Sequence, residues 1–497
     1  MKRNKFLASL LLVLFSFTAC EEDITETNIN PNYLPDAGPK QLLPSGIMWS
    51  AAKIGGDLEL IGGLWAQHYT QNNNASQYRQ LERYNVTSAD YNAIWTNLWA
   101  GALKDLTTIQ QKASVSGDWQ YYVAAEVMAA FDYHVLNDFY GAIPIQEGLD
   151  LETTENPVFV ENKQANTIIL GMLDDAIAKK DQAKALPAMG PEDYVFQGNI
   201  DNWIKFAKSL KLKILMRDLA TNQAAIATLI TENDLLTTVD AKVAVFTDAE
   251  NKSNPLFEQN NRKLNTSINL RASNTLLKYL LANNDPRIEV FYEPTSGSLL
   301  PKPTAPRFSG LEQGNYLLSG TTAPNTVTSG ARLSATDPVF FMTAAEVSFL
   351  KAEFFVRSTT PNLAAAKTNY DDAVSKSFAR GGLSAAPFIE AGGKYAFNAS
   401  GTQEQMLEQI ITQKWVGSTR TQAWDAFLDQ NRTGFPKISA VPTTSASYVP
   451  GQYTVSVNSI LPAGQLPRRL PYPKISRDYN TNTPAPEALT TKMWWHK

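Results

Sequence analysis

The chain has 497 residues, of which 43% are hydrophobic, 19% charged and 10% aromatic, and its formal net charge is −4. This composition is that of a globular protein and excludes a disordered or fibrous chain. The negative charge argues against nucleic-acid binding, since proteins that bind nucleic acids carry a basic surface. The length allows one large domain or two to three ordinary ones.

The first nineteen residues are typical of a secretion signal. Lys2, Arg3 and Lys5 precede an apolar run over residues 6–19. That run is too short to span a membrane as a helix but has the length of a signal-peptide core. No second long apolar stretch follows it. We therefore expect residues 1–19 to be removed from the mature protein.

Cys20 is the only cysteine of the chain, and it follows Thr18 and Ala19. These three residues resemble the end of a bacterial lipobox, although Phe17 replaces the usual leucine-like residue. The resemblance implies that the Cys20 thiol carries diacylglycerol and that the new N-terminus is acylated. Each buried methylene adds about 0.8 kcal/mol, so several acyl chains would anchor the protein firmly to a membrane. An ordinary signal peptide that ends near a cysteine is the alternative.

Residues 20–38 predict a flexible tether rich in Asn and Pro. Its acids Glu21, Glu22, Asp23 and Glu26 resemble the acidic export signal of surface lipoproteins in the Bacteroidetes. The alternative is a solvated acidic tail that carries no targeting signal. The interpretation places the mature protein on the cell surface, anchored by lipid to the outer membrane.

Helical periodicity dominates the rest of the chain. Apolar residues recur at spacings of three and four over residues 94–109, which predicts a helix that Thr87 or Ser88 could cap. A second helix is expected from Trp119 to near Gly141, so that the two form a hairpin. Further helices are predicted over residues 164–183, 202–220, 343–358, 362–380 and 404–432. The best strand signal lies at 452–461.

These elements predict a mostly α fold with tetratricopeptide-like helix pairs, few short strands and long irregular loops, although no strict repeat is visible. The predicted loops cover residues 66–86, 287–339, 381–401 and 436–492. Loops of such length are usually functional or disordered, and the Tyr and Phe residues within these loops argue against simple disorder.

Catalytic motifs are not evident. The three histidines fit no metal-binding spacing, and no nucleophile elbow is present. Glu346 and Glu353 would share one helix face, which is more typical of structural acids than of a catalytic pair. The sequence thus gives no positive sign of an enzyme, and it predicts no cofactor. Whether the loops bind a structural calcium ion is left open, because they contain acids and Asn residues that could ligate one. A glycoside hydrolase also remains a rival, which would need two carboxylates on facing loops.

Two loop segments have the chemistry of a binding site. Residues 65–84 combine amides, arginines and aromatics, and the same mixture recurs over residues 306–320. Aromatic faces stack on sugar rings, while Asn, Gln and Arg bond to hydroxyls or carbonyls. These groups suit an oligosaccharide or a peptide. The alternative is a polar loop whose aromatics merely attach it to the body of the protein.

Several motifs occur in an order that resembles the SusD/RagB family. They are LNDFYGAIPI (136–145), WIKFAKSLKLKILMRDL (203–219), NPLF (254–257), DPRI (285–288), FMTAAEVSFLKAEFF (341–355), ITQKWVG (411–417), NRTGFPK (431–437) and LPRRLPYPKISRDYN (466–480). Each motif is weakly specific, but together they cover almost the whole mature chain. The resemblance implies one SusD-like helical domain over residues 39–497.

The resemblance also implies a function. Members of this family are surface lipoproteins that form the lid of a SusC-like TonB-dependent barrel and deliver nutrients into it without breaking bonds. We therefore expect such a barrel as partner and an oligosaccharide as cargo, with a peptide as the second choice. A tetratricopeptide-like assembly scaffold without small-molecule cargo is a further alternative.

No ligand-binding residue transfers by motif, because the binding loops of the family vary in sequence. By position on the family's ligand face, two groups are expected to bind ligand. The first is Asn72, Asn73, Tyr78, Arg79 and Tyr84, and the second is Phe308, Asn315, Tyr316 and Arg332. Most motif residues, such as Glu346, Glu353, Lys414 and Arg432, are expected to hold helices together instead.

Overall fold

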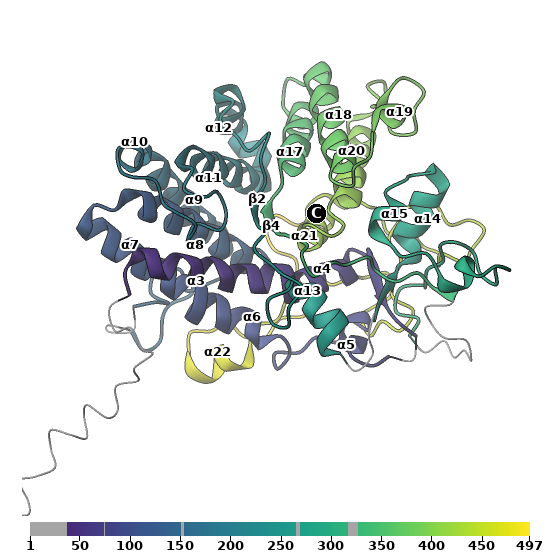
Figure 1. Cartoon of the computed structure of the whole chain (residues 1–497), viewed down its shortest axis with the longest axis horizontal. Helices are drawn as coiled ribbons and strands as arrows, with labels where there is room; N and C mark the ends of the chain where they lie inside the picture. Colours follow the sequence, from purple (N-terminus) through teal and green to yellow (C-terminus); the bar gives the residue numbers. More distant parts are fainter. Residues whose placement is uncertain (1–36, 74, 151–153, 265–268, 317–326) are drawn as a thin grey trace, which may run out of the picture.

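The computed structural model describes residues 37–73, 75–150, 154–264, 269–316 and 327–497. The signal segment, Cys20 and almost all of the predicted tether lie outside these residues. Within them, the chain consists mostly of helices, with long irregular connections and few short strands (Figure 1). The predicted fold class is confirmed.

The N-terminal part is a series of helices, several of which pack against α8. It comprises α3 (Pro39–Ala52), the π-helical η2 (Lys53–Leu58), α4 (Glu59–Trp65), β1 (Tyr69–Gln71), α5 (Arg79–Glu82), α6 (Asn92–Asn97), the π-helical η3 (Leu98–Leu103), α7 (Lys104–Ser116), α8 (Trp119–Tyr140), α9 (Asn162–Ala178) and α10 (Lys180–Lys184). α7 and α8 form the predicted hairpin, and α8 also packs against α9 and α11.

The predicted cap of this hairpin is not formed. The backbone N–H and hydroxyl of Thr87 both donate to Asp90 Oδ2, at 2.8 and 2.7 Å. The Thr87 hydroxyl therefore caps no helix, and α6 begins later, at Asn92.

The central part carries most of the irregular chain. It contains α11 (Ile200–Leu215), η4 (Met216–Asp218), α12 (Leu219–Glu232), β2 (Ala241–Val243), α13 (Pro255–Phe257), the π-helical η5 (Glu258–Lys263), β3 (Leu270–Ala272), α14 (Asn274–Asn283), α15 (Ile288–Phe291) and η6 (Ser296–Leu299). The C-terminal part contains β4 (Val339–Met342), α17 (Ala344–Arg357), α18 (Leu363–Ala379), α19 (Ala386–Ile389), α20 (Gln403–Gly417), α21 (Ala423–Thr433) and α22 (Lys474–Tyr479).

The strands form two small antiparallel ribbons. β1 pairs with β3, and β2 pairs with β4, so each ribbon joins segments that are far apart in the sequence. The predicted strand at 452–461 is wrong, because Tyr453 forms only an isolated bridge to Ile438. In the view of Figure 1, α7 to α12 lie on the left, α17, α18 and α20 in the upper middle, and α14 and α15 on the right.

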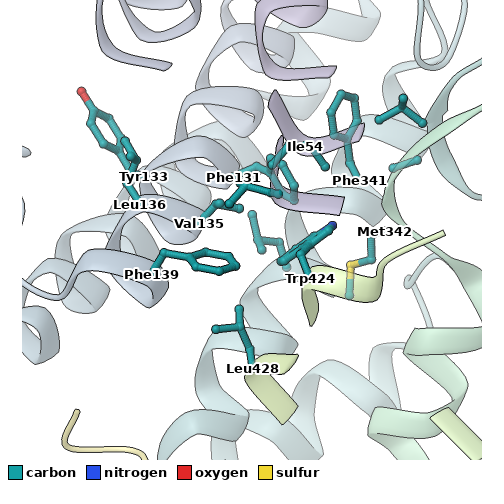
Figure 2. Packing of buried hydrophobic residues seen from close by; sticks show 14 of the residues in the cluster. Ile54, Phe131, Tyr133, Val135, Leu136, Phe139, Phe341, Met342, Trp424 and Leu428 are labelled. Carbon is teal, nitrogen blue, oxygen red and sulfur yellow. The ribbon is translucent and has the colours of Figure 1, made fainter. Parts of the chain in front are cut away.

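The main core lies where α8 meets α21, β4 and η2. Figure 2 shows Phe131 of α8 beside Trp424 of α21 and Phe341 of β4, and the Phe131 ring centroid lies 6.1 and 5.2 Å from theirs. Ile54 of η2 closes this cluster at 1% exposure. A second cluster, around Tyr370, packs α17 against α18 and α20. Among the described residues, no helix is both long and apolar enough to cross a membrane.

Candidate functional site

The first half of the predicted loop 66–86 turns into the protein interior. Gln67 is fully buried and exchanges hydrogen bonds with the backbone of Thr454, at 2.6 and 2.9 Å, while accepting one from Thr275 at 2.6 Å. His68 Nε2 lies 2.9 Å from the carbonyl oxygen of Trp415, and burial lowers the pKa of His68 to about 3. These polar side chains therefore attach the loop to the core.

Glu82 connects the two loop segments in which the sequence predicts a binding site, residues 65–84 and 306–320. Its carboxyl group accepts hydrogen bonds from the Gln71 backbone at 2.9 Å and from the Gln313 amide at 3.2 Å. Burial raises the pKa of Glu82 to about 8 despite these bonds. The backbone N–H of Gly314 also donates to Thr70, at 3.4 Å. The first loop and residues 311–316 thus form one unit.

Four of the predicted ligand-binding residues are buried. Exposure is 3% for Asn72, 3% for Tyr78, 1% for Tyr84 and 4% for Tyr316. The Asn72 backbone donates to the carbonyl oxygen of Asn269 at 2.8 Å, and the Tyr84 hydroxyl accepts from the Ser456 backbone at 3.4 Å. In this conformation these four side chains present little surface to a ligand.

The predicted groups meet at one point. The guanidinium of Arg79, from the first group, lies 5.4 Å from the ring centroid of Tyr316, from the second. Arg79 Nε also donates to the carbonyl oxygen of Ala75 at 2.8 Å. Asn315 precedes Tyr316 and, like Asn73 and Arg79, is half-buried.

The other two members of the second group lie beside α15. Phe308 is half-buried next to Arg307, whose guanidinium pairs with Glu289 at 2.8 Å. Arg332, with a side chain 40% exposed, pairs with Glu293 at 3.0 Å. The positions of Phe308 and Arg332 therefore depend on α15 and on Glu293, which follows its C-cap. The positions of Arg79 and Tyr316 depend instead on the loop that Glu82 holds.

A cavity of about 520 Å³ is lined in part by Val290 and Phe291 of α15, and the sequence pattern did not point to it. We call it the ribbon cavity, because the β2–β4 ribbon supplies part of its wall. Its charged and aromatic lining residues are Asp240, Lys242, Arg287, Phe291, Asp337, Phe340, Lys376, Arg380 and Arg420. They come from distant segments, so no local pattern could have identified the site.

Two further cavities of similar size are present. One, of about 600 Å³, is lined by Trp494, Trp495 and Arg217, and another, of about 520 Å³, lies between the π-helical segments η2 and η5. The cationic side chains that line the cavity of about 600 Å³ are paired with carboxylates; Lys163, for example, pairs with Asp218 at 3.0 Å.

The acids on α17 are structural. Glu346 pairs with Lys213 of α11 at 2.9 Å, and Glu353 pairs with Arg432 of α21 at 2.5 Å. Both carboxylates are at most 3% exposed. Across the described residues, no group of three or more His, Cys, Asp or Glu side chains could hold a metal ion.

The comparisons with known proteins agree with this fold. A family model named SusD-like, described as "Starch-binding associating with outer membrane", matches residues 40–473. No curated protein matches the chain. A solved SusD homolog from Bacteroides uniformis shares 22% identity at a TM-score of 0.73, covering 93% of this chain and 100% of its own. A chitin-binding SusD homolog from Flavobacterium johnsoniae shares 18% identity at a TM-score of 0.72, and the match covers 91% of this chain and 98% of that one. From its sequence match over residues 40–473 and its helical architecture, this chain belongs to the SusD-like family.

Proposed function

We propose that this chain is a lipid-anchored, surface-exposed nutrient-binding protein of the outer membrane. It acts as the lid of a SusC-like TonB-dependent transporter and captures an oligosaccharide for import. The family match over residues 40–473 carries this proposal, since that family is described as starch-binding and associated with the outer membrane. A structural neighbour described as chitin-binding supports a sugar as the first choice of cargo.

Within this proposal, the ligand contacts the half-exposed members of the predicted groups. Asn73, Arg79 and Asn315 form one part of the binding surface, and Phe308 and Arg332 form the other. Arg and Asn bond to sugar hydroxyls, and the Phe308 ring offers an apolar face. The buried Tyr78, Tyr84 and Tyr316 act from beneath by fixing the loops.

Lipidation at Cys20 places the protein at the membrane, and the transporter supplies the energy-coupled step. Closure over the barrel would enclose the cargo between two proteins. Affinity measured on this chain alone is therefore expected to be modest, because part of the binding surface belongs to the partner. No bond is cleaved in this role.

Calorimetric titration of the soluble form, residues 21–497, which lacks Cys20, with oligosaccharides and oligopeptides tests the proposal. We expect saturable binding of one or more oligosaccharides without product formation. Arg79→Ala and Phe308→Ala should each weaken binding by about tenfold, the loss of one good polar or stacking contact. Tyr479→Ala is the control, because Tyr479 is 79% exposed on α22 and belongs to neither group.

Each alternative has its own result. Binding of oligopeptides instead would identify a peptide-binding lid, and hydrolysis of an oligosaccharide would identify an enzyme. Co-purification with a barrel, without any cargo bound by the pair, would favour an assembly scaffold. If neither Arg79→Ala nor Phe308→Ala changes the affinity for a bound ligand, these residues are not the site.

A further inference from the structure

The ribbon cavity has more positive charge than its own carboxylates neutralise. Five cations line it, Lys242, Arg287, Lys376, Arg380 and Arg420, against the carboxylates of Asp240 and Asp337. Its volume of about 520 Å³ falls in the range of small-molecule sites, about 300–1,000 Å³. The pairing of each cation decides which of them is available to a ligand.

Three of the five cations already have close carboxylate partners. Arg287 pairs with Asp285 at 2.6 Å, and Arg420 pairs with Asp337 at 2.6 Å. Lys376 pairs with Asp372 on its own helix. These three shape the wall and contribute little net charge to the cavity.

Lys242 and Arg380 are different. Lys242 makes no ion pair with any residue that the structure describes. Within the same described ranges, the only carboxylate near Arg380 is that of Asp240, at 3.9 Å, which is too long for a hydrogen bond. Asp240 Oδ1 is itself engaged, because it accepts a hydrogen bond from the Ala344 backbone at 2.8 Å.

Both of these cations lie over one aromatic ring. Lys242 and Phe340 are cross-strand partners in the β2–β4 ribbon, and Lys242 Nζ lies 5.7 Å from the Phe340 ring centroid. The guanidinium of Arg380, which follows α18, lies 5.0 Å from the same centroid. The ring attracts the cations but accepts none of their directed hydrogen bonds. The ammonium and guanidinium donors of this pair are thus available for an anion.

Arg420, another lining residue, is held in an unusual backbone conformation. Arg420 has a φ of 65°, in the left-handed region that non-glycine residues seldom adopt. Its side chain donates to the carbonyl oxygen of Val290 at 2.7 Å as well as to Asp337. Such outliers persist only where surrounding contacts enforce them, and they concentrate at ligand-binding sites. Arg420 therefore fixes α15 and Asp337 at the edge of the cavity.

We propose that the ribbon cavity binds an anionic sugar unit, whose carboxylate or sulfate group lies between Lys242 and Arg380. This inference rests on the proposed function, because it names the class of oligosaccharide that the protein captures. The hydroxyl groups of the sugar donate to the carboxylates of Asp240 and Asp337. A sugar is favoured over an acidic peptide by the family's description as starch-binding and by the chitin-binding structural neighbour.

The test compares charged and neutral ligands on the soluble form, residues 21–497. Calorimetry is run with oligogalacturonate, a sulfated galacto-oligosaccharide, a neutral galacto-oligosaccharide of equal length and an acidic peptide, oligoglutamate. At least one of the two anionic sugars should bind, and its affinity should fall as sodium chloride rises, because salt screens the attraction. Lys242→Met and Arg380→Met should each weaken that binding by about tenfold or more, through loss of a charge-assisted bond.

Lys437→Met is the matched control. Lys437 also lies over a phenylalanine, 5.4 Å from the Phe435 ring centroid, but it lines a different cavity. This variant should bind the anionic sugar as the parent does. Thermal unfolding of all three variants verifies that each one folds.

The inference is overturned if neither anionic sugar binds at low salt, or if binding is unchanged in both Lys242→Met and Arg380→Met. Binding of an acidic peptide that is lost in these variants, without binding of either sugar, would overturn the sugar class. If neutral oligosaccharides alone bind, the proposed function stands and this inference fails.

Discussion

Lys414 shows how single buried charges hold this protein together. Its ammonium group is 4% exposed and contacts Asp425 at 2.8 Å, Asp429 at 2.6 Å and Glu346 at 3.5 Å. Burial alone would lower the pKa of Lys414, but the three carboxylates outweigh burial and raise it. The lysine therefore stays charged at every physiological pH, and its carboxylate partners depend on it.

Replacement of Lys414 should be strongly destabilising. Lys414→Met removes a buried cation and leaves Glu346 and Asp425 with Lys213 alone and Asp429 with Arg432 alone. The buried carboxylates then exceed the cations that neutralise them, so we expect a loss of about 3–5 kcal/mol in the free energy of unfolding. The measurement is urea denaturation of both chains. Lys474→Met is the control, because Lys474 pairs with Asp478 on the exposed helix α22 and should lose no more than about 1 kcal/mol. Equal losses in the two variants would contradict this role of Lys414.

Residue type could be predicted from the sequence, but exposure could not. Aromatics in polar loops suit ligand binding, which favours Tyr78, Tyr84 and Tyr316, yet all three are buried. Their burial depends on long-range contacts, such as the bond from the Ser456 backbone to the Tyr84 hydroxyl. By contrast, the structural roles of Glu346 and Lys414 could be predicted, because charged residues within apolar helical patterns must be paired when buried.

At the scale of elements, the approach of α4 to α21 depends on a glycine. A Cβ atom on Gly62 would lie 2.2 Å from the Trp424 backbone nitrogen and 2.3 Å from its Cα. These are backbone atoms of α21, so a side-chain rotation cannot relieve the contact. α4 and α21 can pack at this distance only without a side chain at position 62.

Two glycine variants should therefore have opposite effects on stability. Gly62→Ala forces α4 and α21 apart and should cost about 1–3 kcal/mol or more in the free energy of unfolding. Gly171→Ala should instead add up to about 1 kcal/mol, because alanine is the better helix former. Gly171 lies within α9, and a Cβ atom added there would meet no atom of the described residues within 4 Å outside the helix's own backbone. Thermal unfolding of both variants is the measurement, and destabilisation by Gly171→Ala would contradict this account.

Elements were predictable where their signal is local. α8, α17 and α18 follow the predicted ranges closely, because each has its own apolar periodicity. Strands were not predictable, because a three-residue strand such as β1 exists only through its partner β3, some two hundred residues away. The segment 452–461 alternates as a strand should, but its backbone finds no ladder partner there. The ribbon cavity was missed for the same reason, since its walls come from distant segments.

Across the whole molecule, several buried groups are held in their neutral form. Burial raises the pKa of Glu59, Glu82, Glu126 and Asp132 to about 8. Burial likewise lowers the pKa of His68 and His496 to about 3 and that of His134 to about 4. The folded protein thus binds protons on these acids that the unfolded chain releases near pH 4 to 4.5, and it lacks histidine protons that the unfolded chain binds below pH 6.5.

These shifts predict how stability depends on pH. Between about pH 4.5 and 6.5 the two sets oppose one another, because the histidines favour folding as pH rises and the acids disfavour it. Above pH 6.5 the histidines are neutral in both states, and only the acids still differ. Stability should therefore fall most clearly between pH 6.5 and 8, by up to about 1.4 kcal/mol per pH unit for each acid.

Asp132→Asn isolates one of these acids. Asparagine can still accept the hydrogen bond that the Ser50 hydroxyl donates to Asp132, at 2.6 Å, but it cannot ionise. The variant should therefore lose less stability than the parent between pH 6.5 and 8, with a slope smaller by up to about 1.4 kcal/mol per pH unit. Urea denaturation at pH 6.5, 7.25 and 8 measures both slopes, and Asp478→Asn, at an exposed position of α22, should keep the parental slope. If Asp132→Asn has the parental slope as well, Asp132 is ionised in the folded protein, and the Ser50 contact, rather than protonation, makes its burial tolerable.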